Sequence, residues 1–171
     1  MGKIEIKYGI ITGLGVSAYV MLEFLLGLHT KYIEIGEFSG YFSAIIPILT
    51  LYFAFREKRD LQPGSILPYG KGFLTGLYIS IIASFIIAVF FSIYYAYINP
   101  DFIKDGAEYA RNKMIAMHVS QAKIDQELKD EAEMSRQPMQ FFLTFVGTVF
   151  PGIMLSLIMV LIMKKKRVSK A

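Results

Sequence analysis

Residues 72–98 read GFLTGLYISIIASFIIAVFFSIYYAYI and carry no formally charged side chain over 27 positions. An α-helix rises about 1.5 Å per residue, so about 20 apolar residues cross the hydrocarbon core of a bilayer. A core helix of a soluble protein would show a polar face, whereas this segment offers only small hydroxyls and tyrosines. The tyrosines within residues 94–97 suit the headgroup level. The stretch therefore predicts a transmembrane helix with room to tilt.

Small residues recur along one side of this predicted helix. Gly72, Gly76, Ser80 and Ser84 follow one another at intervals of four. Such spacing predicts a smooth stripe that lets a second membrane helix approach closely. On this spacing Ile79 is expected on a different face.

Three further apolar runs accompany this segment. The chain has 171 residues, of which 54% are hydrophobic, and its mean hydropathy is +0.47. These values are typical of a small multi-pass membrane protein without a separate large soluble domain. We therefore predict one all-α membrane domain over residues 1–171, an integral four-helix bundle. The four transmembrane helices are expected at about 8–28, 38–55, 72–98 and 139–163.

A single sizeable polar segment, residues 99–138, separates the third span from the fourth. Asn99-Pro100-Asp101 has the character of a helix start, with proline in the first turn and an acidic residue after it. A second start is expected at Ser120, and Pro138 closes the segment. Apolar residues within it follow helical spacing. We predict an amphipathic helical hairpin inserted between the third and fourth spans.

The other predicted spans contain prolines and small residues that affect helix shape and packing. Pro47 and Pro151 each remove a backbone hydrogen bond near mid-span, which predicts helix kinks. Close helix packing is also expected at four small residues outside the third span: Gly9, Gly13, Gly152 and Ser156.

The first and third spans share the pattern G-x-x-T-G-L-x-x-S, which begins at Gly9 and at Gly72. This suggests two tandem helix hairpins related by an axis along the membrane normal. The recurrence of small residues in packed membrane helices explains the same pattern without duplication.

The distribution of basic residues predicts the orientation. Four spans place both termini and the loop at 56–71 on one side, with eleven Lys and Arg, against seven on the other side. Basic residues favour the cytoplasmic side. We therefore expect both termini in the cytoplasm and the helical insertion outside it. The basic tail could bind anionic lipid headgroups or merely anchor the topology; its residues are Lys164, Lys165, Lys166 and Arg167.

Glu23 is the one ionisable side chain well inside a predicted span. A carboxylate is costly in lipid, so it should face the protein. It could serve a proton or cation relay, or it could be an interfacial carboxylate held by hydroxyl donors. We expect hydroxyl donors rather than a basic partner. His29 and His118 stand alone, without metal-ligand spacing.

Chemical motifs are missing from this sequence. It contains no cysteine, which excludes disulfides, thiolate metal sites and cysteine nucleophiles. It contains no G-x-S-x-G, P-loop or H-E-x-x-H motif. We expect no enzyme activity, no cofactor, no metal and no nucleic-acid partner.

Several short stretches together resemble a known family. They are the G-F-L-T-G-L opening of the third span, the I-N-P-D-F after it, the acidic insertion, the F-P-G turn and the Lys-rich end. Over nearly the whole chain this resembles the bacterial domain of unknown function 4199 family. The resemblance implies a multi-pass protein in the inner membrane of a Gram-negative bacterium. It brings no activity and no catalytic residue.

Two functions remain open on the sequence. The first is a non-enzymatic scaffold or accessory subunit whose helical hairpin contacts a partner, such as a membrane protein or a second copy, or packs over its own bundle. The second is a small transporter or oligomeric channel that uses Glu23. A wet cavity around Glu23 would favour transport, and a dry, tyrosine-capped Glu23 would favour the scaffold.

Overall fold

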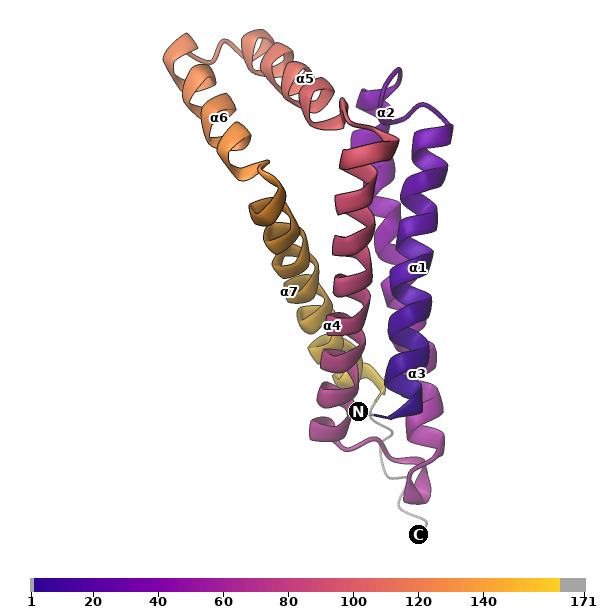
Figure 1. The fold of residues 1–171 in the computed structure, drawn as a ribbon. Coiled ribbons are helices and arrows are strands. Elements are labelled where there is room, and N and C mark those ends of the chain that lie inside the picture. The colour runs from indigo at the N-terminus through magenta and orange to yellow at the C-terminus, as the bar shows by residue number, and fades with distance from the viewer. Residues whose placement is uncertain (1, 164–171) are drawn as a thin grey trace.

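The computed structural model describes residues 2–163, and the part of the chain that it describes contains helices and loops but no strand (Figure 1). The elements in chain order are α1 (Lys3–Leu25), α2 (Ile33–Ser39), the 3₁₀-helix η1 (Gly40–Ala44), α3 (Ile45–Asp60), the 3₁₀-helix η2 (Pro63–Ser65), α4 (Tyr69–Ile93), the π-helix η3 (Tyr94–Ile98), α5 (Phe102–Ala116), α6 (Gln121–Met134) and α7 (Gln137–Met163). The basic tail residues 164–167 lie outside the described range.

Four helical stretches in the described residues are long and apolar enough to cross a membrane. They are Lys3–Leu25, Ile33–Asp60, Tyr69–Ile98 and Pro138–Met163. The helices α5 and α6 stand between the third and fourth of them. The predicted fold class, an all-α membrane bundle with a helical hairpin inserted before the last span, is therefore confirmed.

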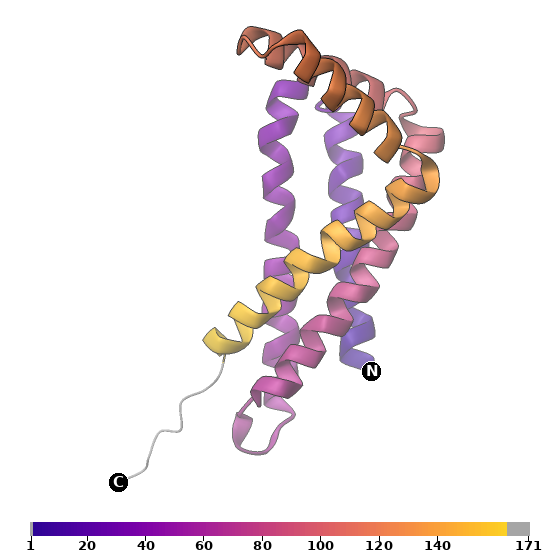
Figure 2. The same cartoon turned by 90° about the vertical axis from the view of Figure 1, so that its left-hand side faces the viewer.

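The bundle has two distinct ends. Gly2 and the α3–α4 connection lie at one end, which we call the terminus end, and α2, α5 and α6 lie at the opposite cap end (Figure 1). The helices α5 and α6, which we call the cap, lie across the cap end, and α7 runs obliquely to the other spans (Figure 2). Among the described residues, the start of α1 and the insertion therefore lie at opposite ends of the molecule.

Two glycines let α1 approach α4 closely. A Cβ atom built on Gly9 would lie 2.7 Å from Cβ of Ile82, and one built on Gly13 would lie 2.7 Å from Cβ of Ile86. No larger side chain fits there unless the helices separate. Glycine thus sets the distance between these spans.

Small residues likewise form the contact between α4 and α7. Gly72 faces the Val160 side chain, and the other two contacts each pair a glycine with a serine: Gly76 with Ser156, and Gly152 with Ser80. Ser84, further along α4, is buried. Ile79, which was expected on a different face from this stripe, is also buried, at 1% exposure. It lies three residues from Gly76, and positions i and i+3 of a helix are neighbours.

The two prolines expected to kink helices lie at different positions in their helices. Pro47 lies in the first turn of α3, directly after the 3₁₀ segment Gly40–Ala44. Its missing N–H leaves the Ser43 carbonyl without the usual helical donor, which fits a change of helix type at this point. Pro151 lies inside α7, which is continuous from Gln137 to Met163.

Candidate functional site

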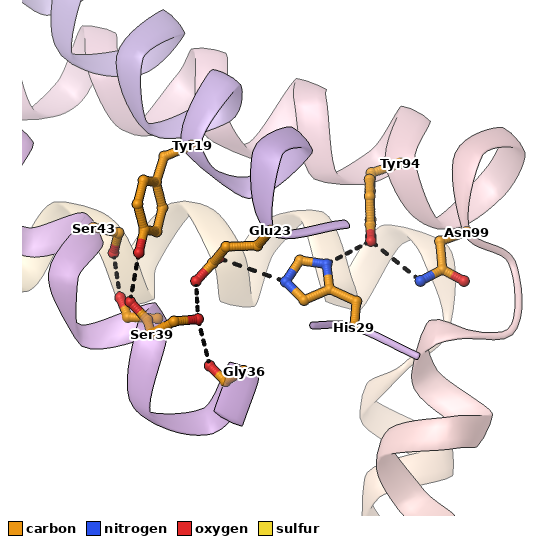
Figure 3. A network of polar contacts seen from close by, with 9 residues as sticks. Tyr19, Glu23, His29, Gly36, Ser39, Ser43, Tyr94 and Asn99 are labelled. Carbon is orange, nitrogen blue, oxygen red and sulfur yellow. Dashed lines mark hydrogen bonds and ion pairs between the residues drawn. The ribbon is translucent and has the colours of Figure 1, made fainter. Parts of the chain in front are cut away.

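Glu23 is buried in the last turns of α1 at the cap end, with 4% of its surface exposed. The hydroxyl of Ser39 in α2 donates a hydrogen bond to Oε1 of Glu23. Nε2 of His29 lies 3.5 Å from Oε2 of the same carboxylate (Figure 3). Tyr19 donates to the Ser39 carbonyl at 2.9 Å and so holds α2 against α1.

A series of hydrogen bonds continues from His29 to Tyr94 and Asn99. Nδ2 of Asn99 donates to the Tyr94 hydroxyl oxygen at 3.1 Å. The Tyr94 hydroxyl can donate its own proton, and Nδ1 of His29, 2.7 Å away, accepts it in the tautomer that carries the ring proton on Nε2. In a neutral imidazole the proton is then on Nε2, which faces Glu23. Each donor in the chain therefore points toward the carboxylate.

A glycine turn after α1 brings His29 back over Glu23. The Leu28 N–H donates to the Glu23 carbonyl at 2.9 Å, and the Gly27 N–H donates to the Phe24 carbonyl at 2.9 Å. This is the double hydrogen bond of a Schellman motif. Gly27 has φ +75°, a left-handed conformation that glycine adopts without steric cost. The local sequence thus reverses the chain at the site.

The positions of Tyr94 and Asn99 depend on a π-helical turn. In η3 the Asn99 N–H donates to the Tyr94 carbonyl at 2.8 Å, five residues back. Single π-turns are frequent at functional sites. Tyr94 is fully buried, with the rings of Phe24 and Phe102 at 5.7 Å edge-on. The polar chain is therefore enclosed by aromatic rings.

Burial lowers the pKa of His29 below its ordinary value of 6.5, and the Glu23 carboxylate opposes part of that effect. The unfolded chain therefore binds this proton more readily than the folded protein does, and stability should fall as the pH drops below about 6.5. The slope from one such group is up to about 1.4 kcal/mol per pH unit.

We expect His29→Gln to flatten the decrease in melting temperature between about pH 7.5 and 5.5, as measured by thermal unfolding in detergent. His118→Asn removes an exposed imidazole as a control; Asn suits the positive φ of 57° at that position. An equal pH dependence in wild type and His29→Gln would contradict the assignment.

A pocket of about 920 Å³ lies between the cap and the cap end of the bundle. Glu23 and His29 line it, together with residues of α2, α5 and α6. Three of the lining residues contact one another. Nζ of Lys113 on α5 donates to both carboxylate oxygens of Glu37 on α2, at 2.7 and 2.8 Å. The Tyr109 hydroxyl donates to the same carboxylate at 3.0 Å. These contacts fasten α5 to α2.

A second buried carboxylate lies at the terminus end. Glu5 in α1 is 3% exposed and accepts hydrogen bonds from Lys58 at 2.7 Å, Thr75 at 3.0 Å and the Gly2 backbone N–H at 2.7 Å. It therefore joins α1 to both α3 and α4. This cluster lies at the opposite end from Glu23.

Two of these residues escaped the sequence analysis. His29 was expected to stand alone, yet its Nε2 lies 3.5 Å from the Glu23 carboxylate. The expected hydroxyl donor to Glu23 is present in Ser39, and this imidazole is an additional partner that was not expected. The signal was Gly27 between Glu23 and His29, a common helix terminator. Glu5 precedes the first span expected from the sequence, at about 8–28, but helix α1 already begins at Lys3. An acidic residue in a first helical turn is too common to mark a buried site.

The described residues contain no group of three or more His, Cys, Asp or Glu that could hold a metal ion. What the site can do is accept hydrogen bonds in a largely apolar setting. A carboxylate has about four acceptor positions, and Glu23 uses one for Ser39 and one for the longer contact with His29.

Comparison with known proteins gives one match. A family model described as "Protein of unknown function (DUF4199)" matches residues 7–165. No curated protein and no solved structure matches the chain.

Proposed function

The chain belongs to the family described as "Protein of unknown function (DUF4199)", and from this premise we propose that it is a non-enzymatic accessory subunit or scaffold of a bacterial inner membrane. The cap would be its interaction surface. The observation that carries this proposal is the setting of Glu23: the carboxylate is buried and held by Ser39 and His29, beside the enclosed Tyr94.

The middle of the bundle supports the same proposal. The hydroxyls of Ser17 and Ser156 donate to carbonyls four residues earlier in their own helices. Thr12 does the same and also contacts Thr50 at 2.7 Å. Such hydroxyls are satisfied locally and do not link the two buried carboxylates. The close contacts of Gly9 and Gly13 with α4 leave little space for a solute at that level.

The cap has the character of an interaction surface. It exposes three large apolar side chains among many charged ones: Ile115 (49%) on α5, Met117 (59%) directly after α5, and Met134 (49%) on α6. Aromatic residues and methionine are enriched at protein interfaces. The Lys113–Glu37 ion pair joins this surface to α2 of the bundle.

Site-specific photocrosslinking in intact cells tests the proposal. A benzophenone side chain at Ile115 should give a discrete protein adduct, whereas one at Phe150, an exposed residue of the α7 span, should react only with lipid. An adduct of twice the mass would identify a second copy as the partner. Absence of any protein adduct from Ile115 and Met117 would refute the cap as an interaction surface.

The orientation proposed for the protein is both termini in the cytoplasm and the cap outside it. Its support is the excess of basic residues on the terminus side. Because the chain lacks cysteine, single cysteines report topology directly. Cysteine at Lys123 in the cap should react with an impermeant maleimide on intact spheroplasts, whereas cysteine at Leu61 should not. The reverse pattern would invert the topology.

Transport is the second candidate function, because Glu23 lines the 920 Å³ pocket. In that case Glu23→Gln would fold normally but abolish proton-coupled flux into liposomes. An accessory subunit would show no flux in either form.

A further inference from the structure

We propose that the pocket between the cap and the bundle is a binding site for an organic cation, namely an ammonium group carried on an apolar chain. This goes beyond the proposed function, because it concerns a ligand of the isolated protein rather than its partner. The site combines a buried carboxylate, apolar lining side chains and several further carboxylates.

The charge of the lining selects a cation. Five carboxylates line the pocket: Glu23, Glu37, Glu127, Asp130 and Glu131. Among the described lining residues Lys113 is the only lysine or arginine, and both oxygens of Glu37 engage it. An anionic ligand would therefore meet uncompensated like charge, while a cation would be attracted to the pocket.

A metal ion fits this lining poorly. The carboxylates and imidazole of the described residues do not converge into any group of three that could coordinate a metal. An ammonium group needs only a few acceptors, and Glu23 has acceptor capacity beyond its contacts with Ser39 and His29. The charge-assisted hydrogen bond would form in a buried setting, where it is strongest.

The remaining lining accommodates an apolar chain. Phe102, Met114, Leu128 and Met134 contribute apolar side chains from both helices of the cap. Methionine adapts to irregular ligand shapes. A volume of about 920 Å³ lies within the range of about 300–1,000 Å³ that is usual for small-molecule sites. The ligand would thus place its ammonium group at Glu23 and its chain against the cap.

Thermal unfolding of the full chain in detergent tests the site, with decylammonium as the probe and decanol as the uncharged control. We expect decylammonium to raise the melting temperature and decanol to have little effect. Glu23→Gln should weaken the apparent affinity about tenfold or more, as expected for loss of a charged hydrogen-bond partner. Glu108→Gln, on α5 but outside the pocket lining, should bind like wild type.

A blocking variant keeps the test decisive if Glu23→Gln fails to fold. Gly106 lines the pocket, and a Cβ built there meets no atom within 4 Å. Gly106→Phe should therefore fill the pocket without disturbing the bundle, and it should abolish binding. Equal affinity in wild type and Gly106→Phe, or equal stabilisation by decanol, would overturn the proposal.

Native mass spectrometry distinguishes the two sources of such a cation. Phosphatidylethanolamine retained by wild type and lost from Gly106→Phe would identify the ammonium headgroup of a membrane lipid. Decylammonium binding without a retained aminolipid would identify a free amine. If neither decylammonium nor phosphatidylethanolamine binds, the proposed cation site is refuted. The crosslinking from Ile115 tests the proposed protein partner independently of this result.

Discussion

Lys58→Met is expected to lower the free energy of unfolding by about 3–5 kcal/mol, the usual cost of removing one partner of a buried ion pair. Lys58 Nζ lies 2.7 Å from Glu5 Oε1, and the side chains are 24% and 4% exposed. The substitution retains most of the apolar stem but leaves the Glu5 carboxylate buried beside only Thr75 and the Gly2 N–H. Chemical or thermal unfolding in detergent would measure the loss.

The same two helices provide the control. Lys7 in α1 and Glu57 in α3 form an ion pair at 2.8 Å with side chains 52% and 38% exposed. Exposed pairs contribute about 0–1 kcal/mol, so Lys7→Met should be nearly neutral. Combining Lys58→Met with Glu5→Gln should recover part of the loss, because no uncompensated charge remains. Equal losses for Lys58→Met and Lys7→Met would show that burial does not govern this pair.

Gly76→Ala should destabilise the contact between α4 and α7 by about 1–3 kcal/mol, the range for overpacking a close-packed interior. A Cβ at this position would overlap the Ser156 side chain and approach Cζ of Phe55 at 3.1 Å. Ser156 is fully buried, so its side chain cannot turn away into open space. Larger substitutions such as Gly76→Leu should prevent assembly of the bundle.

Two further variants separate packing from helix propensity. A Cβ on Gly147 in α7 meets nothing within 4 Å, so Gly147→Ala should stabilise by about 0.5–1 kcal/mol. Adding Ser156→Gly to Gly76→Ala makes room for the new methyl group and should restore part of the stability. Gly76 would not be a packing contact if Ser156→Gly failed to restore stability to Gly76→Ala and if Gly76→Ala and Gly147→Ala changed stability by similar amounts.

Hydropathy and spacing were sufficient for the architecture. A run of 27 uncharged residues must satisfy its backbone internally in lipid, which leaves a helix as the solution for each apolar segment. Pro100 and Ser120 marked the starts of the two cap helices within about two residues, since helix ends have local chemical signals. These features depend on residues close together in the chain, so the sequence contains them directly.

The glycine positions illustrate the limit of that reasoning. The spacing of Gly72, Gly76 and Ser80 predicted a helix contact, but not that α7 provides it through Val160, Ser156 and Gly152. Any of three other spans could have occupied the stripe. The choice depends on the summed packing of all helices, which no local window of sequence contains.

By itself the sequence determined a membrane protein of four spans with a polar helical insertion, because lipid penalises every unpaired backbone group and every unshielded charge. Only the tertiary structure decided the partners of its buried charges. His29, which contacts Glu23, is far in the chain from its partner Tyr94, and Glu5 is far from Lys58. Their meeting requires a turn at Gly27, a π-turn at η3 and the mutual register of α1, α3 and α4, which helix packing sets.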